Sequence, residues 1–116
     1  MNDIKIKRYN SIYEREISNI LQNGIKDSVI KFVTVTGVEI TNDLSYAKVF
    51  VTIFDKEKKD EVLKALDKAK GFIRTKLAAK VDIRKTPELR FVIDESIEYG
   101  YKIDSIIEEI HKKETH

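Results

Sequence analysis

The chain of 116 residues contains no cysteine, one proline and four glycines. The absence of cysteine excludes disulfide frameworks, thiol nucleophiles and zinc sites built from cysteine. No apolar run approaches the roughly 18 residues that cross a membrane, and the first residues lack the apolar core of a signal peptide. We therefore expect a cytoplasmic protein. Proline and glycine fall well below their usual shares of about 5% and 7%, so each one should mark a structural position.

Residues suited to catalysis are also scarce. The two histidines, His111 and His116, lie at the end of the chain, where side chains are often mobile. Asp94 and Glu95 are adjacent, but helix capping explains them more simply than paired acid–base chemistry. The chain contains neither a phosphate-binding loop nor the spacing of a zinc site. We therefore expect no enzymatic activity, no cofactor and no metal.

The composition favours one folded domain that covers residues 1–116. Apolar residues make up 41% of the chain, which is too much for a disordered protein. Charged residues make up 36%, above the roughly 25% that is typical of soluble domains. The length is ordinary for a single domain with its own core.

The first part of the chain predicts a helix over residues 3–23, because its apolar residues recur at helical spacing. Gly24 lies where a residue in the left-handed conformation would end such a helix. The apolar stripe of this helix consists of Ile6, Tyr9, Tyr13, Ile17, Ile20 and Leu21.

Residues 32–54 predict an antiparallel hairpin of two strands, with a turn that begins at Asn42 and Asp43. The apolar alternation changes phase at Gly37, which a β-bulge would explain. The second strand should bury one face, formed by Ala47, Val49, Val51 and Ile53. Its other face contains Tyr46, Lys48, Phe50, Thr52 and Phe54.

A second helical stretch is predicted over residues 60–80. In a straight helix, Lys70 would lie among the apolar residues and Phe72 would lie far from them. A break at Ala69-Lys70-Gly71 would resolve both conflicts, because glycine is unfavourable inside a straight helix and is tolerated at a kink.

The rest of the chain predicts a third strand at residues 89–93 and a final helix over residues 97–112. The predicted order is therefore helix, strand, strand, kinked helix, strand, helix. This order fits an α+β domain in which helices cover one face of a mixed three-stranded sheet.

The net charge of +2 conceals an uneven distribution. Residues 1–31 contain six basic and four acidic residues, residues 32–59 contain four of each, and residues 60–90 contain nine and five. Residues 91–116 contain three basic and seven acidic residues. The basic third segment could bind phosphates or could be a solvated helix face. A glycine kink favours binding, because it lets a phosphate backbone approach closely and frees amide donors.

Several motifs occur in a fixed order along the chain. They are the stretch 37–51 (GVEITNDLSYAKVFV), Gly71-Phe72-Ile73-Arg74, Pro87-Glu88-Leu89-Arg90-Phe91 and Asp94-Glu95-Ser96, with Arg8 and Glu16-Ile17 in the first helix. Together they resemble the bacterial ribosome-binding factor A family over nearly the whole chain. Many relatives have a longer polar tail than this chain, which ends at His116.

The resemblance implies a single domain of the type II KH-like fold. Ordinary KH domains bind nucleic acid with a Gly-x-x-Gly loop, whereas this family has an Ala-x-Gly kink that Ala69-Lys70-Gly71 matches. The implied function is that of a monomeric assembly factor. It would bind precursor 30S subunits and 16S rRNA late in maturation, support processing of the rRNA 5′ end and growth in the cold, and be linked functionally to assembly GTPases.

We expect the basic segment to bind the RNA, with Ala69 and Gly71 shaping the kink. The predicted phosphate contacts are Lys64, Lys68, Lys70, Arg74, Lys76 and Lys80, with Arg84 and Arg90 as secondary candidates and Lys5 and Arg8 as an extension from the first helix.

Two alternatives remain open at this stage. Bases could stack on the sheet face that contains Tyr46, Phe50 and Phe54, unless the final helix covers part of that face. The chain could instead be a non-catalytic interaction module that docks a basic partner through its acidic final helix, which contains Asp104, Glu108 and Glu109.

Overall fold

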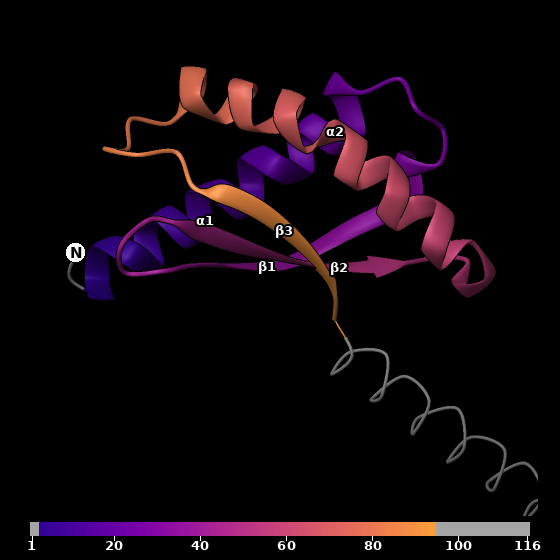
Figure 1. Cartoon of the computed structure of the whole chain (residues 1–116), viewed down its shortest axis with the longest axis horizontal. Coiled ribbons are helices and arrows are strands. Elements are labelled where there is room, and N and C mark those ends of the chain that lie inside the picture. Colours follow the sequence, from indigo (N-terminus) through magenta and orange to yellow (C-terminus); the bar gives the residue numbers. More distant parts are fainter. Residues whose placement is uncertain (1–2, 95–116) are drawn as a thin grey trace, which may run out of the picture.

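The computed structural model describes residues 3–94 of the chain (Figure 1). The predicted final helix over residues 97–112 and the two histidines lie outside these residues. The described part contains three short helical turns, Ile20–Gly24, Ile30–Phe32 and Lys56–Lys58. Its main elements are α1 (Asp3–Asn19), β1 (Val33–Ile40), β2 (Tyr46–Ile53), α2 (Lys59–Lys80) and β3 (Glu88–Ile93).

The predicted apolar stripe of α1 faces the core, where Tyr13, Ile17 and Leu21 are completely buried. The helix continues into a π-helical turn, Ile20–Gly24, and the chain becomes extended at Ile25. No glycine among residues 3–94 has a positive φ, so the left-handed conformation predicted for Gly24 is wrong. The wider π turn ends the helix while keeping both Ile20 and Leu21 buried.

The three strands form a mixed sheet in the order β1-β2-β3, as the element order predicts. β1 and β2 pair antiparallel, and β2 and β3 pair parallel. The register of β1 shifts between Val35 and Gly37, which confirms the predicted bulge and makes Thr36 the extra residue. The Thr36 hydroxyl donates a hydrogen bond of 2.7 Å to Asp94 Oδ2. This bond ties the end of β3 to β1 across the strand between them.

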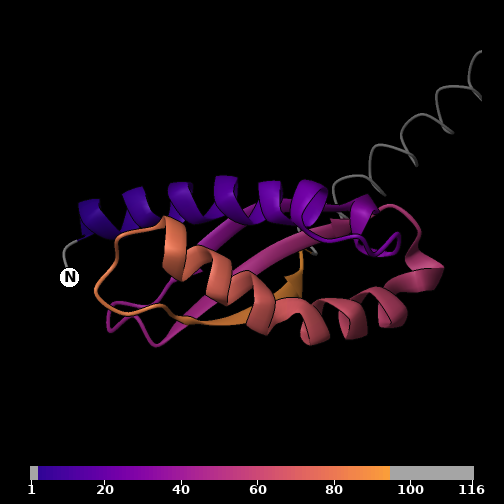
Figure 2. The same ribbon diagram turned by 90° about the horizontal axis from the view of Figure 1, so that it is seen from above.

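Both long helices lie on the same face of the sheet (Figures 1 and 2). Ala47, Val49 and Val51 of β2 are completely buried beneath them, which confirms the predicted inward face of this strand. The core is built from α1, α2 and this face of the sheet. The opposite face, among the described residues, has no helix packed against it.

The kink in α2 is a bend within one continuous helix. The helix runs without interruption from Lys59 to Lys80, and its axis changes direction near the middle (Figure 1). The Thr75 hydroxyl donates to the Gly71 carbonyl oxygen at 2.9 Å, and such back-bonds bend helices. The expected break does not occur, and Phe72 stays 45% exposed. The prediction that a break would return Phe72 to the core is therefore wrong.

Candidate nucleic-acid interface

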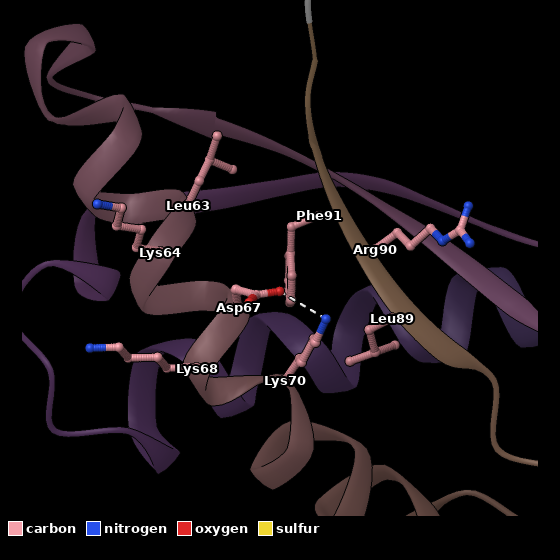
Figure 3. Close-up of a pocket in the computed structure, with 8 residues that line it drawn as sticks. All are labelled: Leu63, Lys64, Asp67, Lys68, Lys70, Leu89, Arg90 and Phe91. Carbon is pink, nitrogen blue, oxygen red and sulfur yellow. Dashed lines mark ion pairs between the residues drawn. The ribbon is translucent and has the colours of Figure 1, made fainter.

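A hollow of about 530 Å³ lies between α2 and β3 (Figure 3). The side chains of Leu63, Asp67 and Lys70 reach it from α2, and those of Leu89 and Phe91 reach it from β3. The alternation of β3 explains this arrangement, since residues two apart on a strand point to the same side. The sequence placed Leu89 and Phe91 in the third strand and did not predict them at a binding surface. Their place within the Pro-Glu-Leu-Arg-Phe motif is the signal that could have linked them to the site.

Lys64 and Lys68 lie at the edge of this hollow and are both exposed. Their spacing of four residues places them on one side of α2, and Figure 3 shows both side chains extending in the same direction, away from β3. Neither makes an ion pair or hydrogen bond within residues 3–94. Both ammonium groups are therefore available to an external anion.

Lys70 points from α2 toward β3 and forms an ion pair of 2.8 Å with Asp67 (Figure 3). Its side chain is 41% exposed. Surface pairs of this kind contribute little to stability, typically about 0–1 kcal/mol. Lys70 can therefore exchange Asp67 for a phosphate at low cost, although Asp67 reduces the local positive potential.

The Arg74 side chain makes hydrogen bonds within the protein. Its Nε donates to the Pro87 carbonyl oxygen at 3.1 Å, and its Nη2 donates to the Thr86 carbonyl oxygen at 2.9 Å. These bonds attach the segment before β3 to α2. The planar guanidinium suits this role, because its donors point in fixed directions.

The last two cations of α2 also have partners within the protein. Lys76 Nζ lies 5.4 Å from the centroid of the Phe72 ring, within cation–π range. Lys80 Nζ lies 3.9 Å from Glu16 Oε2 of α1. The six predicted cations of α2 therefore point in several directions, and only Lys64 and Lys68 form an open pair.

A second basic region lies at the amino-terminal end of α1. The Tyr9 hydroxyl donates to the Asp82 carbonyl oxygen at 3.1 Å, which holds α1 against the loop between α2 and β3 (Figure 2). This contact places the exposed residues Lys5 and Arg8 of α1 on the same end of the molecule as the exposed Arg84.

Arg90 is among the residues that line the hollow, but its guanidinium extends away from the lysines of α2 (Figure 3). It stacks on Tyr46 with 3.9 Å between Cζ and the ring centroid. Phe50 is half-buried on the same strand as Tyr46. Phe54 lies beyond the end of β2 and is 88% exposed, so it is separated from the proposed stacking face. The helix expected to cover this face lies outside residues 3–94.

The described residues hold no group of three or more His, Cys, Asp or Glu side chains that could bind a metal ion. None of the helices within residues 3–94 is long and apolar enough to cross a membrane.

Comparisons with known proteins agree on one family. The family model described as ribosome-binding factor A matches residues 5–107. The ribosome-binding factor A of Staphylococcus carnosus is 44% identical over 115 residues, which cover 98% of this chain and 100% of the relative.

Solved structures give the same result. The crystal structure of ribosome-binding factor A from Thermus thermophilus superposes with a TM-score of 0.70 at 26% identity, covering 76% of this chain and 94% of that one. A homology model of the Thermus thermophilus factor, fitted into a cryo-EM map of a 30S–RbfA complex, gives 0.59 at 27% identity over 72% and 88% of the two chains.

Proposed function

Since this chain belongs to the ribosome-binding factor A family, we propose that it binds precursor 30S subunits and their 16S rRNA during late maturation. In this role it supports processing of the rRNA 5′ end, acts as a monomer in the cytoplasm without catalysing a reaction, and is linked functionally to assembly GTPases. The fit of the Thermus factor into a 30S complex supports the 30S subunit as the partner.

The main support for an RNA-binding surface is the open pair formed by Lys64 and Lys68, which lies beside the hollow between α2 and β3. Two ammonium groups on one side of a helix suit adjacent phosphates of an RNA backbone. The apolar lining from Leu63, Leu89 and Phe91 suits an unstacked base of a single-stranded segment. Phosphate contacts position a protein without reading sequence, so selectivity should come from the shape of the folded RNA.

The other predicted contacts contribute to RNA binding to different extents in this proposal. Lys70 contacts a phosphate after releasing Asp67, and Arg74 acts mainly by holding the segment before β3. The remaining contacts are weaker or lie at a second point of contact; they are Lys76, Lys80, Arg90, Arg84, Lys5 and Arg8.

Charge reversal tests this surface. We expect the double variant Lys64→Glu, Lys68→Glu to lose co-sedimentation with precursor 30S subunits at moderate salt. The dependence of log Kd on log salt should flatten by about 1 for each lysine removed from a phosphate. The matched control Lys26→Glu, Lys31→Glu makes the same charge change at two exposed residues outside the hollow. Equal losses from both variants, or retained binding by the first, would contradict the proposed surface.

The processing role requires a test in cells. A strain that lacks its own family member should accumulate 16S rRNA with an extended 5′ end, and this chain should restore the mature end. The Lys64→Glu, Lys68→Glu variant should fail to restore it at equal protein levels. Full restoration by that variant would separate processing from this surface.

A further inference from the structure

A second hollow, of about 250 Å³, lies where β2 meets the start of α2. Its apolar lining comes from Val29, Phe32, Ile53, Phe54 and Val62. Phe54 is 88% exposed and Phe32 is 67% exposed. Ser28, Asp55 and Lys58 complete the lining. Two phenylalanines this exposed beside one hollow are unusual on a protein surface and indicate a binding site.

The end of the described chain lies beside this hollow. Ile93 pairs with Val51, and the Asp94 amide donates to the Val51 carbonyl oxygen at 2.9 Å. Because β3 runs parallel to β2, the chain leaves Asp94 in the direction of Ile53 and Phe54. Two residues along a strand span about 7 Å, so the described chain ends at Asp94 a short distance from the hollow.

The sequence after Asp94 contains apolar residues that match the apolar lining of the hollow. Isoleucines occur at 103, 106, 107 and 110, the spacing i, i+3, i+4, i+7 of one helix face. A tether this short gives an effective concentration in the millimolar range. A second copy or another protein would have to overcome the full entropy of association, so the tethered segment is the favoured occupant.

We propose that the apolar residues of segment 103–110 bind in the hollow formed with Phe32 and Phe54 of the same chain. This intramolecular contact covers the two exposed aromatic rings.

The chain of 116 residues is suited to a fluorescence test because it contains no tryptophan. Phe54→Trp places a single reporter at the hollow. We expect its quenching by acrylamide to rise roughly two-fold when Ile103, Ile106 and Ile110 are changed to Ser, because docking covers about one face of the ring. Changing Glu108 and Glu109 to Gln in the same segment should leave quenching unchanged.

A reporter at a distant site controls for general effects. Ile4 is 73% exposed at the start of α1, and quenching of Ile4→Trp should not respond to either tail variant. A response at Ile4→Trp equal to that at Phe54→Trp, or no response at Phe54→Trp, would overturn the proposal.

Disulfide trapping identifies the occupant, because the chain contains no native cysteine. The pair Phe54→Cys and Ile106→Cys should form a cross-link within one chain on mild oxidation. The control pair Ile4→Cys and Ile106→Cys should remain reduced. A cross-linked dimer would assign the hollow to a second copy, and equal cross-linking of both pairs would show an unspecific tail; either result overturns the proposal.

Discussion

The two halves of α2 differ in charge and in what their cations contact. Residues 59–70 contain four basic and three acidic residues, and residues 71–80 contain three basic and no acidic residues. In the first half, Lys64 and Lys68 extend into solvent beside the hollow (Figure 3). In the second half, Arg74 bonds the segment before β3 and Lys80 lies near Glu16 of α1. The cations of one basic stretch therefore do not form a single surface. They divide between those that extend into solvent and those that contact other parts of the fold.

The division follows from the neighbours of each half. The second half of α2 lies near both α1 and the segment that leads into β3, where carbonyl oxygens accept hydrogen bonds from Arg74 and the Glu16 carboxylate pairs with Lys80. The side of the first half that contains Lys64 and Lys68 has no such acceptors within hydrogen-bonding distance among residues 3–94. The bend near Gly71 lies between the two halves.

The largest predicted change is a loss of folding stability at alkaline pH. It is caused by Tyr13, which lies near Arg74. Tyr13 is completely buried, and its hydroxyl has no hydrogen-bond partner among residues 3–94. Burial raises the pKa of Tyr13 to about 12, although the positive charge of Arg74 opposes this shift. The unfolded chain ionises near pH 10, so stability from the neutral phenol is complete below pH 10 and is lost between pH 10 and 12. The loss should reach about 3 kcal/mol.

Tyr13→Phe isolates this contribution. The variant should be as stable as the parent or up to about 1 kcal/mol more stable at pH 7, because it removes an unpaired buried hydroxyl. Urea denaturation at pH 8 to 12 should show its advantage growing with pH. Parallel curves for the two proteins across this range would refute the assignment.

The next effect tests the structural role of the second half of α2. Arg74→Ala should lower the free energy of unfolding by about 2 kcal/mol, because it removes two charge-assisted hydrogen bonds. Arg74→Lys should recover only part of this loss, since an ammonium group cannot reproduce the paired geometry. Lys68→Ala should change stability by less than about 0.5 kcal/mol. Equal costs for Arg74→Ala and Lys68→Ala in urea titrations would remove the distinction between the halves.

A smaller change in stability is expected from a substitution at the bend in α2. Gly71 is exposed, and a methyl group there would meet no atom within 4 Å. Gly71→Ala should therefore stabilise the protein by about 0.5–1 kcal/mol through helix propensity. The same methyl group lies one turn from Lys68 and should hinder a phosphate backbone, so binding to 30S subunits should weaken. A gain in stability without any loss of binding would show that close approach at Gly71 is unimportant.

The smallest effect concerns Lys80 and Glu16. Their distance of 3.9 Å and the 49% exposure of Lys80 describe a surface pair, for which about 0.5 kcal/mol is typical. The double-mutant cycle of Lys80→Ala and Glu16→Ala should give a coupling of this size that disappears in 1 M salt. A coupling above about 1 kcal/mol would mean that this ion pair contributes more than a typical surface pair to the attachment of α2 to α1.

Much of the architecture could be predicted from the sequence because it depends on local periodicity. The stripe of α1, the hairpin and the phase change at Gly37 all follow from which side chains must avoid water, and the structure confirms them. The end of α1 could not be predicted in this way. Gly24 permits a left-handed conformation, but the need to bury both Ile20 and Leu21 favours a π turn.

The turn between β1 and β2 contains a second feature that local rules missed. Leu44 has a φ of 62° and is completely buried, although this conformation is rare for a large side chain. Neighbouring hydrogen bonds hold the turn, and they also lower the pKa of Asp43 to about 2 through its contacts with Thr41 and Ser45. Burial of the Leu44 side chain compensates for the backbone strain.

Residue type and spacing along the chain were enough to predict the order of the elements through β3, the apolar stripe of α1, the inward face of β2 and the family. Which cations are free could be known only from the folded structure, since that depends on acceptors brought from α1 and from the segment before β3. It also brought Phe32 and Phe54 together at one hollow. Contacts between residues far apart in the chain have no local pattern, and at this protein's surface they separate the cations that face solvent from the cations that hold the fold.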